Sequence, residues 1–239
     1  MAILNGQGGI ALAESIQMNV IARVRSDFPT KFGIPRQSGL AAGLMATLVF
    51  EPAYRDENAL RGIEQFSHLW LIWVFSENVG AGWSPTVRPP RLGGNVRMGV
   101  FATRSPFRPN PVGLSSVKLD GVEKLPGLGT VLHISGADLM DGTPILDIKP
   151  YIPGSDLHPD AAEGFSGPAA CHTLEVVFPE ALLTRIPQEK RAALIEVLSQ
   201  DPRPAYQRDP GRIYGFPFAG VELRFCVDGG CLTVQDVLQ

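Results

Sequence analysis

The densest group of residues that could do chemistry lies between Trp83 and Leu114, where arginines alternate with prolines and glycines. Proline fixes the backbone and glycine lets it approach a ligand closely, so this composition favours a rigid binding loop. Arginine guanidiniums on such a frame suit phosphates or carboxylates through bidentate hydrogen bonds. Composition alone does not name the ligand, and a proline-rich loop can also be plain scaffolding.

Two shorter segments carry further polar side chains. Asp138 and Asp141 precede a Gly-Thr-Pro sequence, and two carboxylates so spaced could bind ribose hydroxyls, an ammonium group or a metal. From these residues alone, a turn at Asp141-Gly142 capped by Asp138 is the slightly favoured explanation. Arg36 and Gln37 lie on a predicted turn after the first strand, and from the sequence alone they are two loop side chains that could hydrogen-bond a ligand.

The sequence gives little support for a metal site or for a hydrolase site with a serine nucleophile. The histidines His68, His133, His158 and His172 are scattered without metal-ligand spacing, so no metal site is expected. Ser67 and His68 are neighbours in sequence, and adjacent strand residues point to opposite faces, which argues against a hydrolase couple.

Charge is distributed unevenly along the chain. Lysine and arginine number 21 against 24 aspartates and glutamates, which gives a net charge of −3. From Asn78 to Leu119 there is no acidic residue, and the cations of this tract are Arg88, Arg91, Arg97, Arg104, Arg108 and Lys118. A local basic patch concentrates its field at one surface. The tract favours contact with an anion or nucleic acid over ion pairs with distant acids.

The elements that must position these residues are predicted to be short strands. With 26 glycines and 21 prolines the chain is too interrupted for long helices. Apolar runs bounded by turn residues predict strands at Ile16–Val24, Leu44–Phe50, Leu69–Phe75, Met98–Thr103, Val112–Leu119, Thr130–Ser135 and Ile145–Ile148. A short helix is expected around Asp56–Ile63. Because repeated strand–helix–strand units are absent, the pattern predicts a mainly β fold, a closed antiparallel or mixed β-barrel.

Domain organisation follows from changes in composition. Residues 1–15 are expected to form a flexible tail, and the barrel domain is expected over 16–178, ending with a strand at Thr173–Phe178. Residues 153–170 are rich in Pro, Gly, Asp and Ala and predict a linker or long surface loop. Residues 179–239 predict a small C-terminal unit made of a helix plus a hairpin.

The C-terminal unit has clear helix and turn signals. Helical spacing over Thr184–Gln200 predicts a helix with Thr184 as its N-cap and Pro187 in the first turn. The final segment predicts a hairpin that turns at Asp228-Gly229. That register would place Cys226 opposite Cys231, with two free thiols preferred over a disulfide.

Cysteine usage and hydropathy indicate the compartment. Cys171, Cys226 and Cys231 lack C-x-x-C spacing, which fits a reducing cytoplasm. The first cation is Arg23 and no run of 18 apolar residues occurs, so neither a signal peptide nor a membrane span is expected.

Six motifs occur together and in a fixed order along the chain. They are Ile34-Pro-Arg-Gln37, Phe66-Ser-His-Leu-Trp70, Arg88-Pro-Pro-Arg-Leu-Gly-Gly-Asn95, Gly99-Val-Phe-Ala-Thr-Arg-Ser105, Arg108-Pro-Asn-Pro111 and Asp141-Gly-Thr-Pro144. Together they closely resemble the bacterial TsaA-like family. Its characterised members are tRNA methyltransferases of the TrmO type, acting on N6 of threonylcarbamoyladenosine next to the anticodon. The segment Gln200–Tyr206 also resembles the C-terminal extension of longer bacterial members.

The resemblance implies a β-barrel that binds S-adenosylmethionine and assembles as a homodimer. Carried across motif by motif, the implied cofactor-binding residues are Pro35, Arg36, Gln37, Ser76, Glu77, Asn78, Arg104, Leu114, Asp138, Leu139, Met140 and Asp141. Some members have a His-Gln pair where this chain has Ser76-Glu77. A backbone contact is therefore expected at these two positions.

The implied substrate is tRNA, bound at its anticodon loop. The basic tract would meet phosphates there, and Trp83, Phe101 or Phe107 could stack on unpaired bases. The expected substrate-binding residues are Arg88, Arg91, Asn95, Arg108 and Asn110. No residue is assigned a catalytic role, because methyl transfer from an activated sulfonium mainly requires alignment of the two centres. A non-catalytic RNA- or nucleotide-binding barrel and a small-molecule methyltransferase are the alternatives.

Overall fold

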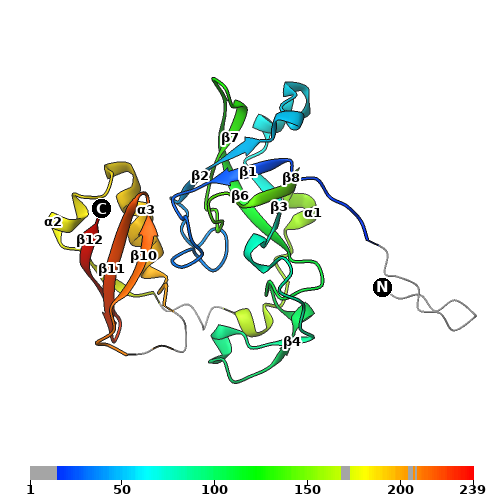
Figure 1. Cartoon of the computed structure of the whole chain (residues 1–239). Coiled ribbons are helices and arrows are strands. Elements are labelled where there is room, and N and C mark those ends of the chain that lie inside the picture. The colour runs from blue at the N-terminus through cyan, green and yellow to red at the C-terminus, as the bar shows by residue number, and fades with distance from the viewer. Residues whose placement is uncertain (1–14, 168–172, 204–206, 208) are drawn as a thin grey trace, which may run out of the picture.

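The computed structural model describes residues 15–167, 173–203, 207 and 209–239. Almost all of the predicted tail over 1–15, and Cys171, therefore lie outside the described residues. Strands dominate, so the prediction of a mainly β fold is confirmed. Figure 1 shows a barrel next to a smaller C-terminal unit, in which helices pack beside a second sheet.

Six antiparallel strands form a closed barrel in the order β1-β2-β7-β6-β3-β8, and β8 pairs back to β1. Their bounds are β1 (Ala22–Arg25), β2 (Met45–Phe50), β3 (His68–Val74), β6 (Val112–Leu125), β7 (Gly129–Ser135) and β8 (Pro144–Pro150). Alternate residues point inward, as Leu69, Leu71 and Trp73 do on β3. These side chains join a hydrophobic core inside the barrel.

Among the predicted barrel strands, β6 runs on to Leu125 instead of ending at Leu119, and two others differ more from the structure. Strand β1 begins at Ala22 instead of Ile16, and Ala22 pairs with Phe50, the last residue of β2. The run Met98–Thr103 is no barrel strand: β5 (Met98–Gly99) pairs with β4 (Thr86–Val87) in a separate ribbon. The next residues turn into the 3₁₀ helix η6 (Val100–Ala102), which leaves Phe101 exposed.

Short helical turns connect the barrel strands. The predicted helix at Asp56–Ile63 is replaced by two 3₁₀ turns, because Gly62 between them has a left-handed φ of 89°. Besides η6, the short helical elements before the C-terminal unit are η1 (Pro52–Tyr54), η2 (Glu57–Leu60), η3 (Ile63–Gln65), η4 (Ser76–Asn78), η5 (Pro90–Leu92), α1 (Pro153–Asp156) and η7 (Gly164–Ser166). Among the residues that the structure describes, no helix is long and apolar enough to span a membrane.

The C-terminal unit contains two helices and a four-stranded sheet with the order β10-β11-β12-β9. The elements are β9 (Glu175–Val177), α2 (Glu180–Leu183), α3 (Gln188–Ser199), β10 (Tyr214–Phe218), β11 (Val221–Asp228) and β12 (Cys231–Leu238). The strand expected to end the barrel, β9, instead pairs in parallel with β12. Its neighbour Leu174 is buried in the C-terminal core, which explains why the segment joins this sheet.

Local details of the unit also differ from the sequence predictions. Helix α3 begins after Pro187, while Thr184 closes α2 and is not the N-cap of α3. The hairpin turns at Gly229-Gly230, because Asp228 pairs with Cys231. Cys226 consequently faces Thr233, and both described cysteines are free thiols, as preferred from the sequence.

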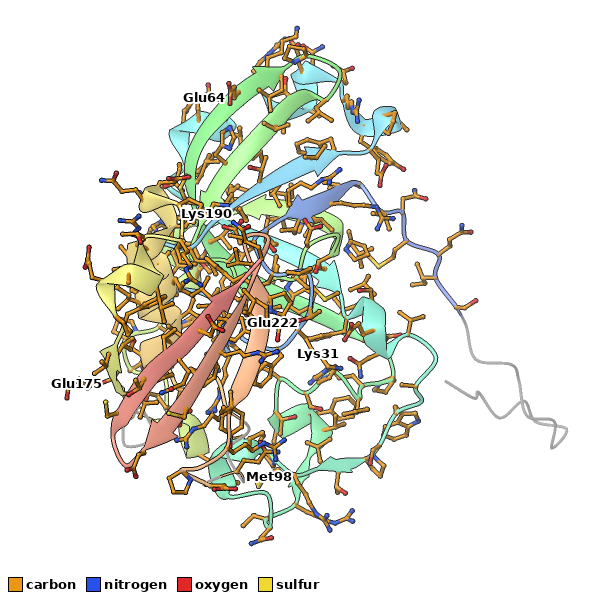
Figure 2. All side chains as sticks on the ribbon, turned by 60° about the vertical axis from the view of Figure 1, so that its left-hand side comes forward. Lys31, Glu64, Met98, Glu175, Lys190 and Glu222 are labelled. Atoms are coloured by element: carbon orange, nitrogen blue, oxygen red, sulfur yellow. The ribbon has the colours of Figure 1, made fainter. Side chains whose placement is uncertain are left out.

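One loop of the barrel belongs to the C-terminal core. Phe28, Ala41 and Leu44 lie between β1 and β2, yet they are buried among residues of α3 and of β10 to β12. Lys190 of α3, labelled in Figure 2, forms an ion pair with Asp27 at the start of this loop. The two hydrophobic cores are thus joined through the chain that connects β1 and β2.

Candidate functional site

A cavity of about 520 Å³ opens where β3 ends and β6 begins. This volume lies within the range of roughly 300–1,000 Å³ that small-molecule sites occupy. Its wall also includes parts of the β1–β2 loop, η4, the loop before β6 and the β7–β8 loop. The predicted cofactor residues that line it are Pro35, Arg36, Gln37, Ser76, Glu77, Asn78, Arg104, Leu114, Asp138 and Met140.

The other two predicted cofactor residues take part in packing and backbone support outside this cavity. Leu139 is buried in the barrel core. The Asp141 carboxylate accepts a hydrogen bond from the backbone N–H of Ser26 at 3.1 Å, and the Asp141 N–H donates to the carbonyl of Phe28. Asp141 therefore fastens the β7–β8 loop to the end of β1.

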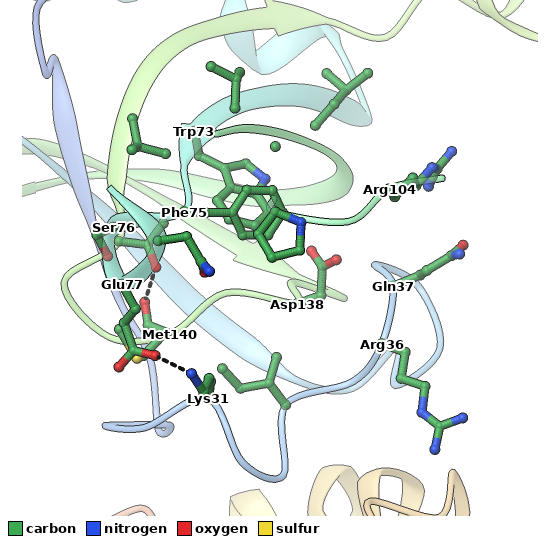
Figure 3. Close-up of a pocket in the computed structure, with 18 of the residues that line it drawn as sticks. Lys31, Arg36, Gln37, Trp73, Phe75, Ser76, Glu77, Arg104, Asp138 and Met140 are labelled. Atoms are coloured by element: carbon green, nitrogen blue, oxygen red, sulfur yellow. Dashed lines mark hydrogen bonds and ion pairs between the residues drawn. The ribbon is translucent and has the colours of Figure 1, made fainter. Parts of the chain in front are cut away.

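The carboxylate of Asp138, which is labelled in Figure 3, is held by a chain of hydrogen bonds that starts at Trp73 and passes through Ser115. The Trp73 indole Nε1 donates to Ser115 Oγ at 3.0 Å, and Ser115 Oγ donates to Asp138 Oδ1 at 2.6 Å. Burial raises the pKa of Asp138, while the hydrogen bond from Ser115 opposes this shift and nearby Arg104 lowers the pKa to a lesser extent. A cationic or hydrogen-bond-donating ligand would therefore stabilise the ionised form of this carboxyl group.

Two aromatic rings line part of the cavity beside Asp138 (Figure 3). The rings of Trp73 and Phe75 have centroids 4.2 Å apart, and Phe75 is tied to the chain before β6 by a backbone bond to Pro111. Gly113 lets the Trp73 ring lie against the β6 backbone, because a Cβ there would be 2.3 Å from Trp73 Cε2. The two rings are tilted by 59° to each other and give the cavity an angled apolar wall.

The β1–β2 loop forms the side of the cavity nearest the C-terminal unit. Lys31 pairs with Glu77 across the rim at 3.1 Å. The Arg36 guanidinium, in contrast, is directed away from Asp138, as Figure 3 shows. Its Nη2 donates to the backbone carbonyls of Asp201 at 3.3 Å and Arg203 at 3.1 Å. Arg36 thus connects the cavity wall to the C-terminal unit.

A second, larger cavity of about 1130 Å³ adjoins the first. The residues lining both cavities are Arg36, Gln37, Thr103, Arg104 and Pro106. Beyond this shared wall, the second cavity is lined by Arg88, by the aromatic rings of Phe101 and Phe107, and by Phe165 of η7. It therefore combines arginine side chains and the carboxylate of Glu163 with several aromatic surfaces.

The predicted substrate residues are dispersed. Arg88 lines the second cavity, whereas Arg108 lines the first and donates to the carbonyls of Val100 and Thr103. Its guanidinium also lies 5.7 Å from the centre of the Phe101 ring. Asn95 and Asn110 are exposed and border neither cavity, and the side chain of Arg91 is not among those described.

Several residues that line the cavities or support their walls were not predicted. Trp73 and Phe75 carried a signal, because a strand apolar on both faces ends there, but the sequence did not show that they face a ligand cavity. Ser115 gave no signal at all, since its role depends on Trp73 and Asp138 meeting across β6. The segment at Phe165 was predicted to be a linker or surface loop, yet it closes part of the second cavity.

Other candidate chemistry lies outside the two cavities. Ser67 Oγ is 2.9 Å from His68 Nδ1, so the prediction that these side chains point apart is wrong. Ser67 precedes β3, so the alternation of side chains along a strand does not apply to it. Both residues are exposed and lie at the opposite end of β3 from the first cavity. In the part of the chain that the structure describes, no group of three His, Cys, Asp or Glu side chains could hold a metal.

Comparison with known proteins shows to which family this chain belongs. Residues 23–157 match the tRNA-methyltransferase O N-terminal domain, and residues 172–239 match the TrmO C-terminal domain. The chain is 44% identical over 208 residues to an Escherichia coli K12 protein named tRNA (adenine(37)-N6)-methyltransferase, covering 84% of this chain and 88% of the relative. An Eikenella corrodens protein of the same name is 48% identical over 174 residues, covering 72% and 97% of the two chains. A crystal structure of TrmO from Pseudomonas aeruginosa superposes with a TM-score of 0.75 at 35% identity, covering 95% of this chain and all of that one. The chain belongs to the tRNA-methyltransferase O family.

Proposed function

We propose that this protein is an S-adenosylmethionine-dependent methyltransferase that acts on N6 of adenine 37 in tRNA. The observation that carries the proposal is the pair of adjoining cavities, which share a wall at Gln37 and Arg104. Such a pair can hold a methyl donor and a nucleoside side by side. Relatives from two bacteria are named for this reaction.

The first cavity has the chemistry needed to hold the cofactor. Asp138 can accept hydrogen bonds from an ammonium or from ribose hydroxyls, and Arg104 can pair with a carboxylate. Trp73 and Phe75 supply apolar surface for a purine ring. S-adenosylmethionine supplies a methyl group that is already activated on a sulfonium. The buried carboxylate of Asp138 also suits a ligand that carries positive charge.

The second cavity suits a nucleoside extruded from an RNA loop. Phe101, Phe107 and Phe165 offer surfaces on which unpaired bases can stack, and Arg88 can bind a phosphate. The shared wall fixes the relation between the two ligands, and orientation of two reactants can contribute on the order of 7–11 kcal/mol to catalysis. Alignment alone thus accounts for much of the rate without a dedicated base.

Some features of the proposal go further than the reaction for which the relatives are named. We propose that the adenosine carries a threonylcarbamoyl group, and that the protein acts as a homodimer in the cytoplasm. We also propose two domains, with their boundary between residues 158 and 172 instead of at 178, because β9 belongs to the C-terminal sheet. Sedimentation velocity tests the dimer directly.

Cofactor binding is the first test. Isothermal titration with S-adenosylmethionine should give saturable binding to the wild type, and Asp138→Asn should weaken it. Asp160→Asn is the matched control, because Asp160 is exposed and borders neither cavity. Absence of binding to the wild type would contradict both methyltransferase functions.

The second test measures the product. Nucleosides of tRNA from a deletion strain, with and without the gene restored, are separated by mass spectrometry. We expect methylated threonylcarbamoyladenosine only when the wild-type gene or Asp160→Asn is present. Cofactor binding without this product would instead support a small-molecule methyltransferase, and RNA binding without any methylated product would support a non-catalytic barrel.

A further inference from the structure

The C-terminal unit contacts the loop that forms one wall of the first cavity. This loop, residues 27–44, connects β1 to β2 and includes the cavity residues Lys31 and Pro35–Gln37. Its apolar side chains Phe28, Ala41 and Leu44 are buried in the C-terminal core. The loop is therefore packed by the C-terminal unit, although the strands on either side of it belong to the barrel.

Polar contacts fasten both ends of the same loop. At its start, Lys190 of α3 pairs with Asp27, and the backbone N–H of Ala219 donates to the Asp27 carbonyl at 2.9 Å. Toward its end, the backbone N–H of Gly43 donates to Glu196 Oε2 at 3.0 Å. Helix α3 thus contacts the loop on both sides of the cavity residues.

The middle of the loop is held by Arg36. Its Nη2 donates to the carbonyls of Asp201 and Arg203, which follow α3. Those carbonyls are themselves fixed, because the Arg203 guanidinium makes two hydrogen bonds to the Asp201 carboxylate, at 2.8 and 2.9 Å, and the Arg203 side chain is only 11% exposed. Asp201 also has a left-handed φ of 52°, a strained conformation that this bidentate clamp maintains.

We propose that the C-terminal unit positions the cofactor wall: the Asp201–Arg203 clamp and Glu196 hold loop 27–44 in the shape that the first cavity requires. Arg36 acts as the link between unit and cavity. The identity of the ligand rests on the proposed function, but the mechanical role of the unit does not. This role differs from RNA contact, because the contacts described run from the C-terminal unit to the loop and not to an outer surface.

The experiment compares four variants of the full-length protein with the wild type. Arg203→Ala removes the clamp, and Glu196→Ala removes the acceptor for Gly43. Glu196→Gln keeps an acceptor oxygen and serves as the rescue. Arg185→Ala is the matched control, because Arg185 binds Asp236 and the Val237 carbonyl within the same unit, away from the loop.

Two quantities are measured without catalysis: amide hydrogen exchange in residues 33–44 and the dissociation constant for S-adenosylmethionine. In Arg203→Ala and Glu196→Ala we expect exchange in this loop to accelerate about tenfold and cofactor affinity to fall about three- to tenfold, since each variant loses a charged hydrogen bond. Glu196→Gln and Arg185→Ala should stay near the wild type. Exchange in the barrel strands reports whether the fold is intact.

The outcomes separate the two proposals. If the wild type does not bind the cofactor, the proposed function fails, while the exchange data still decide the positioning role. If the wild type binds but both alanine variants leave loop exchange and affinity unchanged, the positioning role is overturned. Should Arg203→Ala also unfold the C-terminal unit, the difference between Glu196→Ala and Glu196→Gln decides the question.

Discussion

Removing the Ser115 hydroxyl tests how the carboxylate in the first cavity is held. In Ser115→Ala the buried Trp73 N–H loses its acceptor and Asp138 loses a donor. An unsatisfied buried donor costs about 1–3 kcal/mol, and a hydrogen bond to a charged group contributes about 1.5–3 kcal/mol. Because Asp138 keeps backbone hydrogen bonds, including one from Ser38, we expect a combined loss of about 2–4 kcal/mol in the free energy of unfolding.

Urea denaturation at pH 7 measures this loss, and Ser116→Ala is the matched control. Ser116 is the next residue on β6, so its side chain points to the other side of the strand and its removal should change stability by less than about 0.5 kcal/mol. Ser115→Ala should also weaken S-adenosylmethionine binding, because Asp138 is no longer oriented. Equal stability and equal cofactor affinity in the two variants would refute the idea that Ser115 positions Asp138.

Three further predictions follow from single side chains. Gly113→Ala should lose about 1–3 kcal/mol in thermal unfolding and alter tryptophan fluorescence, because the new Cβ would overlap Trp73. The folded-state pKa of Asp138 lies above the unfolded-state value of 3.8. Ionisation of Asp138 therefore lowers the free energy of unfolding at high pH, and this loss is absent below pH 3.8. Asp138→Asn should therefore gain stability relative to the wild type as the pH rises from 3.8 through the folded-state pKa in paired urea titrations, and a constant difference would contradict the shift. Arg88→Ala should make the slope of log K against log salt for tRNA binding shallower by about 0.7, measured beside Arg61→Ala, whose cation borders neither cavity.

Much of the barrel could be predicted because its strands show a strong local pattern. The run at β3 is apolar, short and bounded by turn residues, and it became a barrel strand with alternate residues buried. The run at Met98–Thr103 has similar composition but no barrel neighbour to pair with. Its first two residues instead pair with β4, and its later backbone bonds go to Pro85 and within the turn at Val100. Pairing partners distant in sequence decide such cases, and composition does not contain them.

The candidate site could be predicted where a motif places a residue directly on a ligand wall. Asp138 and Arg104 were named from motifs and lie together in the first cavity. Arg36 shows where this reasoning stops, because the sequence gives the guanidinium but not its direction. The carbonyls that it contacts belong to residues 201 and 203, beyond the barrel domain. Likewise, Ser115 becomes informative only after β6 has brought it between Trp73 and Asp138.

The two cavities share Arg36 and Arg104 at their common wall but differ in the carboxylates that lie beyond it, and this difference can keep their ligands apart. The first contains Asp138, whose negative charge is poorly solvated and would be stabilised by a cationic ligand. The second is bordered by Arg88 from the tract without acids and by the exposed carboxylate of Glu163, and no buried carboxylate is among its lining residues. A sulfonium is therefore favoured beside Asp138, whereas an anionic backbone is favoured beside Arg88 and would meet a poorly solvated carboxylate in the first cavity. Because this separation operates within a few residues of the shared wall, the net charge of −3 gives no indication of where RNA would bind.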